Sequence, residues 1–167
     1  MSPTTQFRID SADSLNVSNV EIHDFLTRAY VKGGYTSAER GEVLFAPPTV
    51  RARGNLICAR PKGADVLAGM VIVVTPDSPA RRLANADEAE LHLLAVDDAY
   101  RSLGLGRALV GAATDIARGL GFRKIVLWTQ PSMTAAQKLY ESAGFVRAAH
   151  RDPTINGMPF LAYESQG

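Results

Sequence analysis

The loop from Arg101 to Arg107 carries the clearest sequence signal for ligand binding. Its two glycines, Gly104 and Gly106, lie between an apolar run that favours a strand and a periodic run that favours a helix. Glycines let backbone N–H groups approach an anion closely, and a helix N-terminus adds the positive end of its dipole. The spacing predicts a phosphate-binding turn, although the same glycines also suit a plain strand-to-helix connection.

The better-known phosphate motifs do not fit this loop. A P-loop needs Gly-Lys followed by Ser or Thr, which the chain lacks. The dinucleotide fingerprint needs a third glycine at the position where this chain has Leu109. The ligand is therefore expected to belong to another class of phosphate-bearing molecule.

Three side chains that can donate or accept protons flank the loop in the sequence, two before it and one after it. Glu90 and His92 are two residues apart on a predicted strand, so they share one of its faces. Tyr140 falls on a predicted amphipathic helix. Such groups act as acids or bases when they face a cleft. The alternatives are a solvated glutamate, a hydrogen-bonded core histidine and a tyrosine that packs its ring in the core.

The first half of the chain predicts a strand, a helix and a hairpin. Residues 7–9 favour a strand, polar residues at 10–14 are typical of a helix cap, and apolar spacing over 17–30 predicts a helix. The segment 35–54 is ambiguous between short helices and an ordered loop. Apolar runs at 56–59 and 66–74 predict an antiparallel pair.

The second half predicts alternating strands and helices. A strand at 89–96, the glycine loop, a helix over 105–120 and a strand at 124–128 indicate two parallel strands joined by a right-handed crossover. A helix between Pro131 and Gly144 and two closing strands, 145–149 and 160–163, complete the pattern. No repeat or linker interrupts it, so we expect one α/β domain with a mixed sheet over residues 1–167.

Length and composition exclude several classes of function. The 167 residues contain 18 Lys and Arg against 17 Asp and Glu, and this balance disfavours nucleic-acid binding. The single cysteine, Cys58, rules out an intrachain disulfide, and no Cys/His spacing indicates a metal site. The N-terminus lacks the features of a secretory signal, and the longest apolar run is far shorter than the ~20 residues that span a bilayer. We expect a cytoplasmic protein without membrane or nucleic-acid partners.

The chain resembles the GCN5-related N-acetyltransferase (GNAT) family. The run Arg101-Ser102-Leu103-Gly104-Leu105-Gly106 matches the family signature of Arg or Gln, two residues, Gly, one residue, and Gly or Ala. The resemblance extends from Glu90-Leu91-His92-Leu93-Leu94-Ala95-Val96 through Leu139-Tyr140-Glu141-Ser142-Ala143-Gly144-Phe145. It implies the GNAT fold, an α/β (α+β) mixed sheet that is mostly antiparallel, has one splayed parallel strand pair and is flanked by helices.

The resemblance also implies acetyl-CoA as cosubstrate, with no metal. The glycine loop would bind its pyrophosphate, and the strand edge from Leu94 to Val96 would pair with its pantetheine arm, with the Val96 amide near the thioester oxygen. The implied cofactor-binding residues are Leu94, Ala95, Val96, Arg101, Ser102, Leu103, Gly104, Leu105, Gly106 and Arg107.

The implied reaction is acetyl transfer from sulfur to a primary amine by direct attack in a ternary complex. The amine must lose a proton, and the departing thiolate benefits from one. Tyr140 stands where similar enzymes carry a proton-donating tyrosine. Glu90 is the first candidate base, because histone-acetylating members have a glutamate there, and His92 is the second, because serotonin-acetylating members have histidines at both places. A partly desolvated Glu90 is expected to have a raised pKa.

Two positions depart from the family pattern. Many bacterial relatives have an asparagine before the tyrosine helix and a glutamate on the preceding strand, where this chain has Met133 and Trp128. Contacts from that asparagine and a base on that strand are therefore not expected, which favours Glu90. Trp128, Tyr30 and Tyr35 could line an acceptor cleft or fill the core.

The acceptor amine is not predicted by the sequence. The segment 35–53 holds Glu39 and Glu42 against three arginines, so no charge preference emerges. The alternatives to an enzyme are a non-catalytic acyl-CoA-binding regulatory module and a protein-interaction domain. An exposed sheet edge could support a homodimer.

Overall fold

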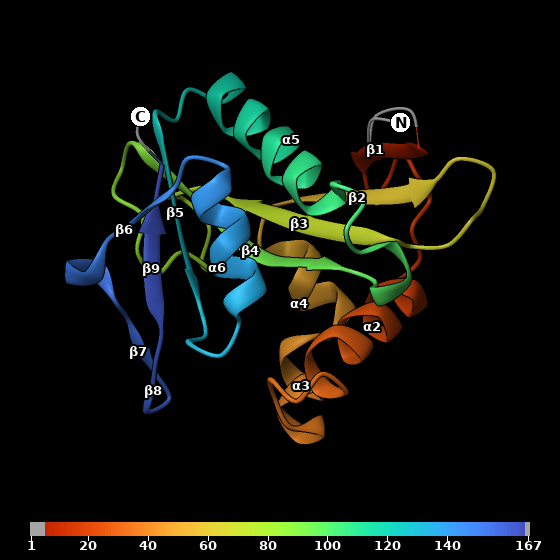
Figure 1. Cartoon of the computed structure of the whole chain (residues 1–167), viewed down its shortest axis with the longest axis horizontal. Helices are drawn as coiled ribbons and strands as arrows, with labels where there is room; N and C mark the ends of the chain where they lie inside the picture. The colour runs from red at the N-terminus through yellow and green to blue at the C-terminus, as the bar shows by residue number, and fades with distance from the viewer. Residues whose placement is uncertain (1–5, 166–167) are drawn as a thin grey trace.

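A seven-stranded mixed sheet forms the centre of the computed structural model, which describes residues 6–165 (Figure 1). The strand order is β1-β2-β3-β4-β5-β9-β6, and every neighbouring pair is antiparallel except β4 and β5. This arrangement confirms the predicted fold class. The strands are β1 (Phe7–Ser11), β2 (Asn55–Pro61), β3 (Gly69–Val74), β4 (Glu88–Val96), β5 (Lys124–Thr129), β6 (Val146–Arg147) and β9 (Leu161–Glu164).

Helices cover both faces of the sheet, with α5 and α6 on one face and α2, α3 and α4 on the other (Figure 1). One short 3-10 turn precedes α5, and a second 3-10 turn and a small hairpin, β7–β8, lie between β6 and β9. The bounds are α2 (Asn19–Leu26), continued by a π-helical segment (Thr27–Val31), α3 (Ala38–Leu44), α4 (Pro47–Ala52), α5 (Leu105–Gly119), α6 (Thr134–Ser142), 3-10 turns at Asp98–Tyr100 and Ala149–Arg151, β7 (Thr154–Ile155) and β8 (Met158–Pro159).

Local sequence explains where the first helices begin. Ser18 caps α2 in a capping box with Glu21, so the cap lies after the polar residues at 10–14 that the sequence suggested. The ambiguous segment 35–54 forms two short helices. Ser37 caps α3, and Pro47 begins α4 at a position where its missing N–H costs nothing.

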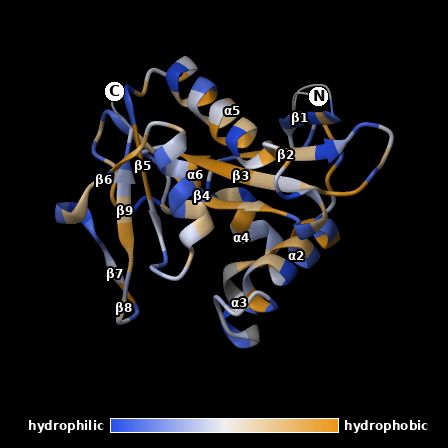
Figure 2. Cartoon of the chain, viewed as in Figure 1, coloured by the Kyte–Doolittle hydropathy of each residue, from blue (hydrophilic) through white to orange (hydrophobic). Residues whose placement is uncertain are grey.

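Alternation along the strands separates two hydrophobic cores. On β2, Ile57 and Ala59 face the core beneath α5 and α6, whereas Cys58 faces the core against α2 and α4. Figure 2 shows hydrophobic residues concentrated on the central strands β3 and β4, and helices with mixed hydrophilic and hydrophobic faces. Every residue of β3 is buried, so the sheet is covered on both faces there.

The parallel strands β4 and β5 separate after a short paired stretch. Only Glu88–Glu90 pairs with Lys124–Val126, so within residues 6–165 the remainder of β4 has no strand partner on that edge. Leu93 has a φ of 52°, and the pairing of β4 with β3 shifts register at this point. This bulge bends β4 away from β5. Together with the parallel pairing, it confirms the splayed strand pair implied by the resemblance.

No helix within residues 6–165 is both long and apolar enough to cross a bilayer.

Candidate active site

A cavity of about 720 Å³ lies where β4 and β5 separate. The bulge lets four consecutive residues of β4, Leu91–Leu94, contribute to its wall, and β5 contributes Trp128 and Thr129. Tyr140 of α6 closes one side, and Met158 of the small hairpin closes another. The volume is typical of small-molecule sites.

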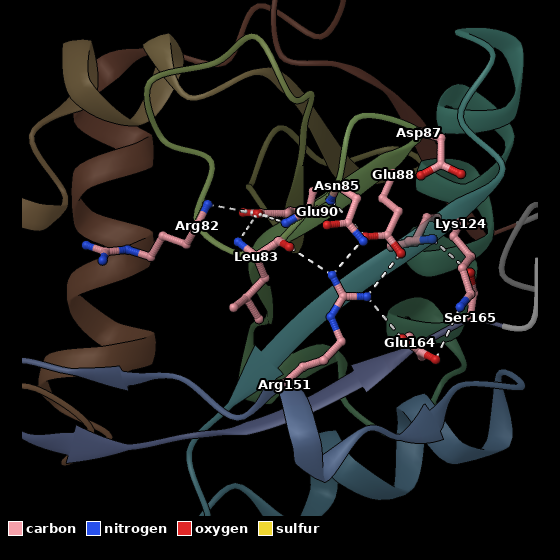
Figure 3. A network of polar contacts seen from close by, with 12 residues as sticks. Arg82, Leu83, Asn85, Asp87, Glu88, Glu90, Lys124, Arg151, Glu164 and Ser165 are labelled. Carbon is pink, nitrogen blue, oxygen red and sulfur yellow. Dashed lines mark hydrogen bonds and ion pairs between the residues drawn. The ribbon is translucent and has the colours of Figure 1, made fainter.

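Glu90 lies behind the cavity wall and is fully buried. Its Oε2 accepts backbone N–H groups from Arg82, Leu83 and Ala84 at 2.8, 2.6 and 2.7 Å, and its Oε1 lies 2.8 Å from Nε2 of His92. Figure 3 shows the Arg82 and Leu83 amides converging on this carboxylate. Both of its oxygens are therefore occupied by donors of the protein itself.

The hydrogen bonds decide the charge of Glu90. Burial alone would raise the pKa of Glu90, but the bond from His92 and the three backbone donors outweigh burial and lower it. The expectation of a raised pKa was therefore wrong, because the sequence does not show that four donors surround this carboxylate. Glu90 is an anion that holds its neighbours in place.

His92 lies between Glu90 and the cavity. Burial lowers the pKa of His92, with Glu90 opposing this effect, so the ring is neutral at neutral pH. Its Nδ1 lies 3.4 Å from a guanidinium nitrogen of Arg53, which can only donate. The proton therefore sits on Nε2, directed at Glu90, and Nδ1 keeps its lone pair. Trp128 packs edge-on against the ring at 4.9 Å between centroids.

Arg151 fixes the loop that holds Glu90. Its guanidinium donates to the carbonyl of Leu83 at 2.8 Å and pairs with Glu88 at 2.8 Å and Glu164 at 3.1 Å (Figure 3). The N–H of Leu83 is one of the three amides bound to Glu90. Contacts thus run from Arg151 through this loop to Glu90 and His92. The spacing of these residues along the sequence gives no indication of these contacts.

Tyr140 is buried on α6, and its ring packs near those of Phe145 and Tyr163. It lines the same cavity as His92. Burial raises the pKa of Tyr140, so its hydroxyl keeps its proton at neutral pH. Within the described residues this hydroxyl forms no hydrogen bond, so it can interact with a molecule in the cavity.

The glycine loop presents a series of unpaired amides. Ser102 and Gly104 have φ values of 63° and 81°, and Gly104 caps α5. In the described part of the chain, no backbone N–H from Ser102 to Arg107 donates to another protein group. The loop lies outside the cavity and packs close to the end of β4 and to α6, because a Cβ on Gly106 would lie 3.7 Å from Val96 and 3.0 Å from Leu139. Such a run of free amides suits an anion.

The strand residues that the resemblance implies for cosubstrate binding, Leu94 to Val96, lie between the cavity and the glycine loop. Ala95 and Val96 pair with β3 on one edge, and in the part of the chain that the structure describes the other edge has no strand partner beyond Glu90. Leu94 lines the cavity, and its carbonyl accepts the Tyr30 hydroxyl at 3.1 Å. The open edge therefore connects the cavity with the glycine loop.

Some site features were missed by sequence reasoning. Arg53 and Arg82 both line the cavity, and a lone arginine in a loop carries no signal of such a position. Tyr30, Tyr35 and Trp128, left open between cleft and core, all lie on the cavity wall. Among residues 6–165, no group of three or more His, Cys, Asp or Glu side chains gathers in a way that could hold a metal ion.

Comparison with known proteins shows which family the sequence matches. The family model described as "Acetyltransferase (GNAT) family" matches residues 20–145. Over 60 residues, or 36% of this chain, the sequence is 42% identical to a mycothiol acetyltransferase of Geodermatophilus obscurus. Over 74 residues, or 42% of the chain, it is 42% identical to the alanine N-acetyltransferase of ribosomal protein bS18 of Escherichia coli. The matched segments make up 20% and 50% of those two relatives.

Solved structures share the whole fold. The Escherichia coli ribosomal-protein-S18-alanine N-acetyltransferase superposes with a TM-score of 0.65 at 24% identity, covering 95% of this chain and 92% of that one. A Bacillus subtilis acetyltransferase in complex with CoA gives 0.67 at 22% identity, covering 96% and 98%. An acetyltransferase of Staphylococcus aureus Mu50 gives 0.74 at 16% identity, covering 95% and 98%.

Proposed function

The chain belongs to the GNAT acetyltransferase family, and on this premise we propose that it transfers an acetyl group from acetyl-CoA to a primary amine by direct attack in a ternary complex. One observation carries the proposal. A neutral, oriented histidine and a protonated tyrosine, His92 and Tyr140, line the same cavity at the point where β4 and β5 separate. These are the two proton-transfer groups that the reaction needs.

His92 is the base in this proposal, and Glu90 positions it. The Nδ1 of His92 accepts the proton of the amine, directly or through one water, and the negative charge of Glu90 stabilises the imidazolium that forms. The contact with Arg53 at 3.4 Å is long for a hydrogen bond, so the proton of an acceptor can replace it. Glu90 itself is buried and has both oxygens occupied, which makes it a positioning residue rather than the base.

Tyr140 supplies the proton for the leaving thiolate. In the transfer, an N–C bond forms as the C–S bond breaks, CoA leaves as the thiol, and one proton of the ammonium group is released to solvent. The buried hydroxyl of Tyr140 is a weak acid, and a developing thiolate nearby is the group to which it can donate. The amide of Val96 is the proposed donor to the thioester oxygen.

The glycine loop is the proposed site for the pyrophosphate of the cosubstrate. Acetyl-CoA, when bound, supplies the thioester that reacts with the amine. The free amides from Ser102 to Arg107 and the N-terminus of α5 fit a pyrophosphate, and the unpaired edge of β4 fits the extended arm that follows it. The relatives named above are a mycothiol acetyltransferase and an alanine N-acetyltransferase of ribosomal protein bS18. Small molecules and proteins are therefore both candidate acceptors for this chain.

A thiol-release assay tests the proposal. The protein is incubated with acetyl-CoA and a panel of amines and peptides, and free CoA is measured alongside acetyl-CoA binding by calorimetry. Amine-dependent release supports an enzyme. Binding of acetyl-CoA without release for any amine would instead support a non-catalytic acyl-CoA-binding module, and absence of binding would leave only a protein-interaction domain.

A further inference from the structure

The charged residues that line the cavity are all basic. Arg40, Arg53 and Arg82 contribute to its wall, whereas no Asp or Glu of the described residues lines it. Glu39 and Glu42, the two acidic residues of the segment 35–53, do not line the cavity. The cavity wall is therefore positively charged, which the mixed composition of the segment 35–53 does not indicate.

One of these arginines contacts the proposed base, and a second acts on it electrostatically. Arg53 is half-buried and contacts Nδ1 of His92 at 3.4 Å, and the charges of Arg53 and Arg82 act on one another and on His92. The backbone N–H of Arg82 is bound to Glu90, while its side chain extends away from that carboxylate (Figure 3). Arg53 thus lies beside the position where the acceptor must react, and the exposed side chain of Arg82 adds a second positive charge at the cavity wall.

These arginines are not positioned to serve the phosphates of the cosubstrate. None of the residues from Arg101 to Arg107 lines the cavity, and the free amides of that loop are the separate place for the pyrophosphate. Arg53 and Arg82 instead share the cavity with the rings of Tyr35, Trp128 and Phe160. An anion bound near them would have to belong to the molecule that shares the cavity with His92.

We propose that the acceptor is a small amine that carries an anionic group, a carboxylate or a phosphate, bound by Arg53 and Arg82, with an apolar part against the aromatic wall. The inference rests on the proposed function and names the class of its substrate. Guanidinium groups bind both kinds of anion through paired N–H donors. The bound anion would also offset the positive charges beside His92 at the moment when the imidazole takes a proton.

Matched substrate pairs test this inference. Thiol release is measured for L-phenylalanine and its amide, for β-alanine and its amide, and for phosphoethanolamine and ethanolamine. We expect the anionic member of at least one pair to have a kcat/KM at least about tenfold higher than its neutral partner, as expected for a charged hydrogen bond. The first two pairs report on a carboxylate and the third on a phosphate.

Variants then locate the anion site. Arg82→Gln keeps the backbone N–H bound to Glu90 and should reduce the preference for the anionic member by about tenfold, chiefly through KM. Arg81→Gln alters an exposed neighbour that does not line the cavity and should leave the preference unchanged. Loss of the preference in Arg40→Gln but not in Arg82→Gln would overturn the assigned site.

The two proposals fail in different ways. Equal or better use of the neutral member in every pair would overturn the anionic-acceptor inference while leaving acetyl transfer intact. Acetyl-CoA binding with no release for any pair or for the wider amine and peptide panel would overturn the proposed function, and the inference with it.

Discussion

The chemistry of the site depends first on a single tautomer, that of His92. Glu90 accepts a hydrogen bond from Nε2, so the reactive lone pair lies on Nδ1, on the side of Arg53. The sequence predicted that Glu90 and His92 share a strand face, and their 2.8 Å contact confirms it. It could not predict which of them faces the cavity, because three amides from a separate loop surround Glu90.

Glu90→Gln should disable the base while preserving the fold. The carboxamide can still accept the backbone amides, but its NH₂ group toward His92 would force Nε2 to accept and Nδ1 to carry the proton. We expect kcat to fall by about 10²–10⁴-fold, the range of a lost general base. Single-turnover kinetics measures the effect, with the exposed Glu141→Gln as control. An unchanged kcat in Glu90→Gln would contradict the positioning role.

The pH dependence of kcat/KM should follow the neutral form of His92. Burial lowers the pKa of His92 below its ordinary value of 6.5, so the active neutral form is already dominant at pH 7. Activity should therefore be level through neutral pH and fall only as pH drops below 6.5, through the lowered pKa. A pH–rate profile that is still rising at pH 7 because of His92, judged against His92→Ala, would argue against this assignment.

Tyr140→Phe should reduce turnover without weakening cosubstrate binding. The variant removes only a hydroxyl that has no partner within the described residues, so stability should change little. We expect kcat to fall by about 10²-fold or more, as for a lost general acid, with an unchanged Kd for acetyl-CoA. Tyr163→Phe is the matched control, because Tyr163 is buried beside Tyr140 but does not line the cavity. Equal turnover in the wild type and Tyr140→Phe would show that the ring only packs.

The loop that precedes α5 illustrates how far local sequence determines an element. The glycines and the apolar runs on either side of them predicted a strand, a turn and a helix N-terminus, and the structure has all three. The bulge at Leu93 was not predicted, because leucine gives no signal for a φ of 52°. Its position follows from the pairing of β4 with β3 and from its departure from β5, which are contacts between distant segments.

Gly104→Ala should weaken cosubstrate binding through the backbone. Gly104 has a φ of 81°, where an alanine costs about 1 kcal/mol, and relief of that strain would move the amides of the loop. We expect the Kd for acetyl-CoA to rise by about tenfold in calorimetry. Gly111→Ala is the control, because a Cβ there meets open space within α5. It should leave affinity unchanged and stabilise the helix by up to about 1 kcal/mol; equal affinity in the two variants would refute the prediction.

Across the whole molecule, charged groups connect segments that are far apart in the sequence. Arg151 links the loop at Leu83 to Glu88 on β4 and Glu164 on β9, and thereby supports the elements around His92. The mixed sheet flanked by helices was predictable from periodicity and element order. The contacts of Arg151 were not predictable, because a charged residue gives no sequence signal for partners that lie far away along the chain.

Stability should fall in acid because of these buried carboxylates. Hydrogen bonds from Arg151 lower the pKa of Glu88, and those from His92 and the backbone lower that of Glu90 against the effect of burial. A lowered pKa adds stability above the unfolded value of 4.5, and this stability is lost as pH falls through the folded pKa. Urea unfolding at pH 7 and below pH 4.5 should show the loss, which Glu88→Gln should reduce. An equal pH dependence of the free energy of unfolding in the wild type and Glu88→Gln would show that Glu88 does not contribute to the loss of stability in acid.

The most direct test of the account is product analysis with acetyl-CoA in the presence and absence of an amine. We predict that free CoA and acetylated amine form in equal amounts, that both require the acceptor, and that no acetylated protein accumulates when the acceptor is omitted. Acetyl-CoA binding without an acetylated amine, or an acetyl-enzyme formed without acceptor, would contradict direct transfer in a ternary complex.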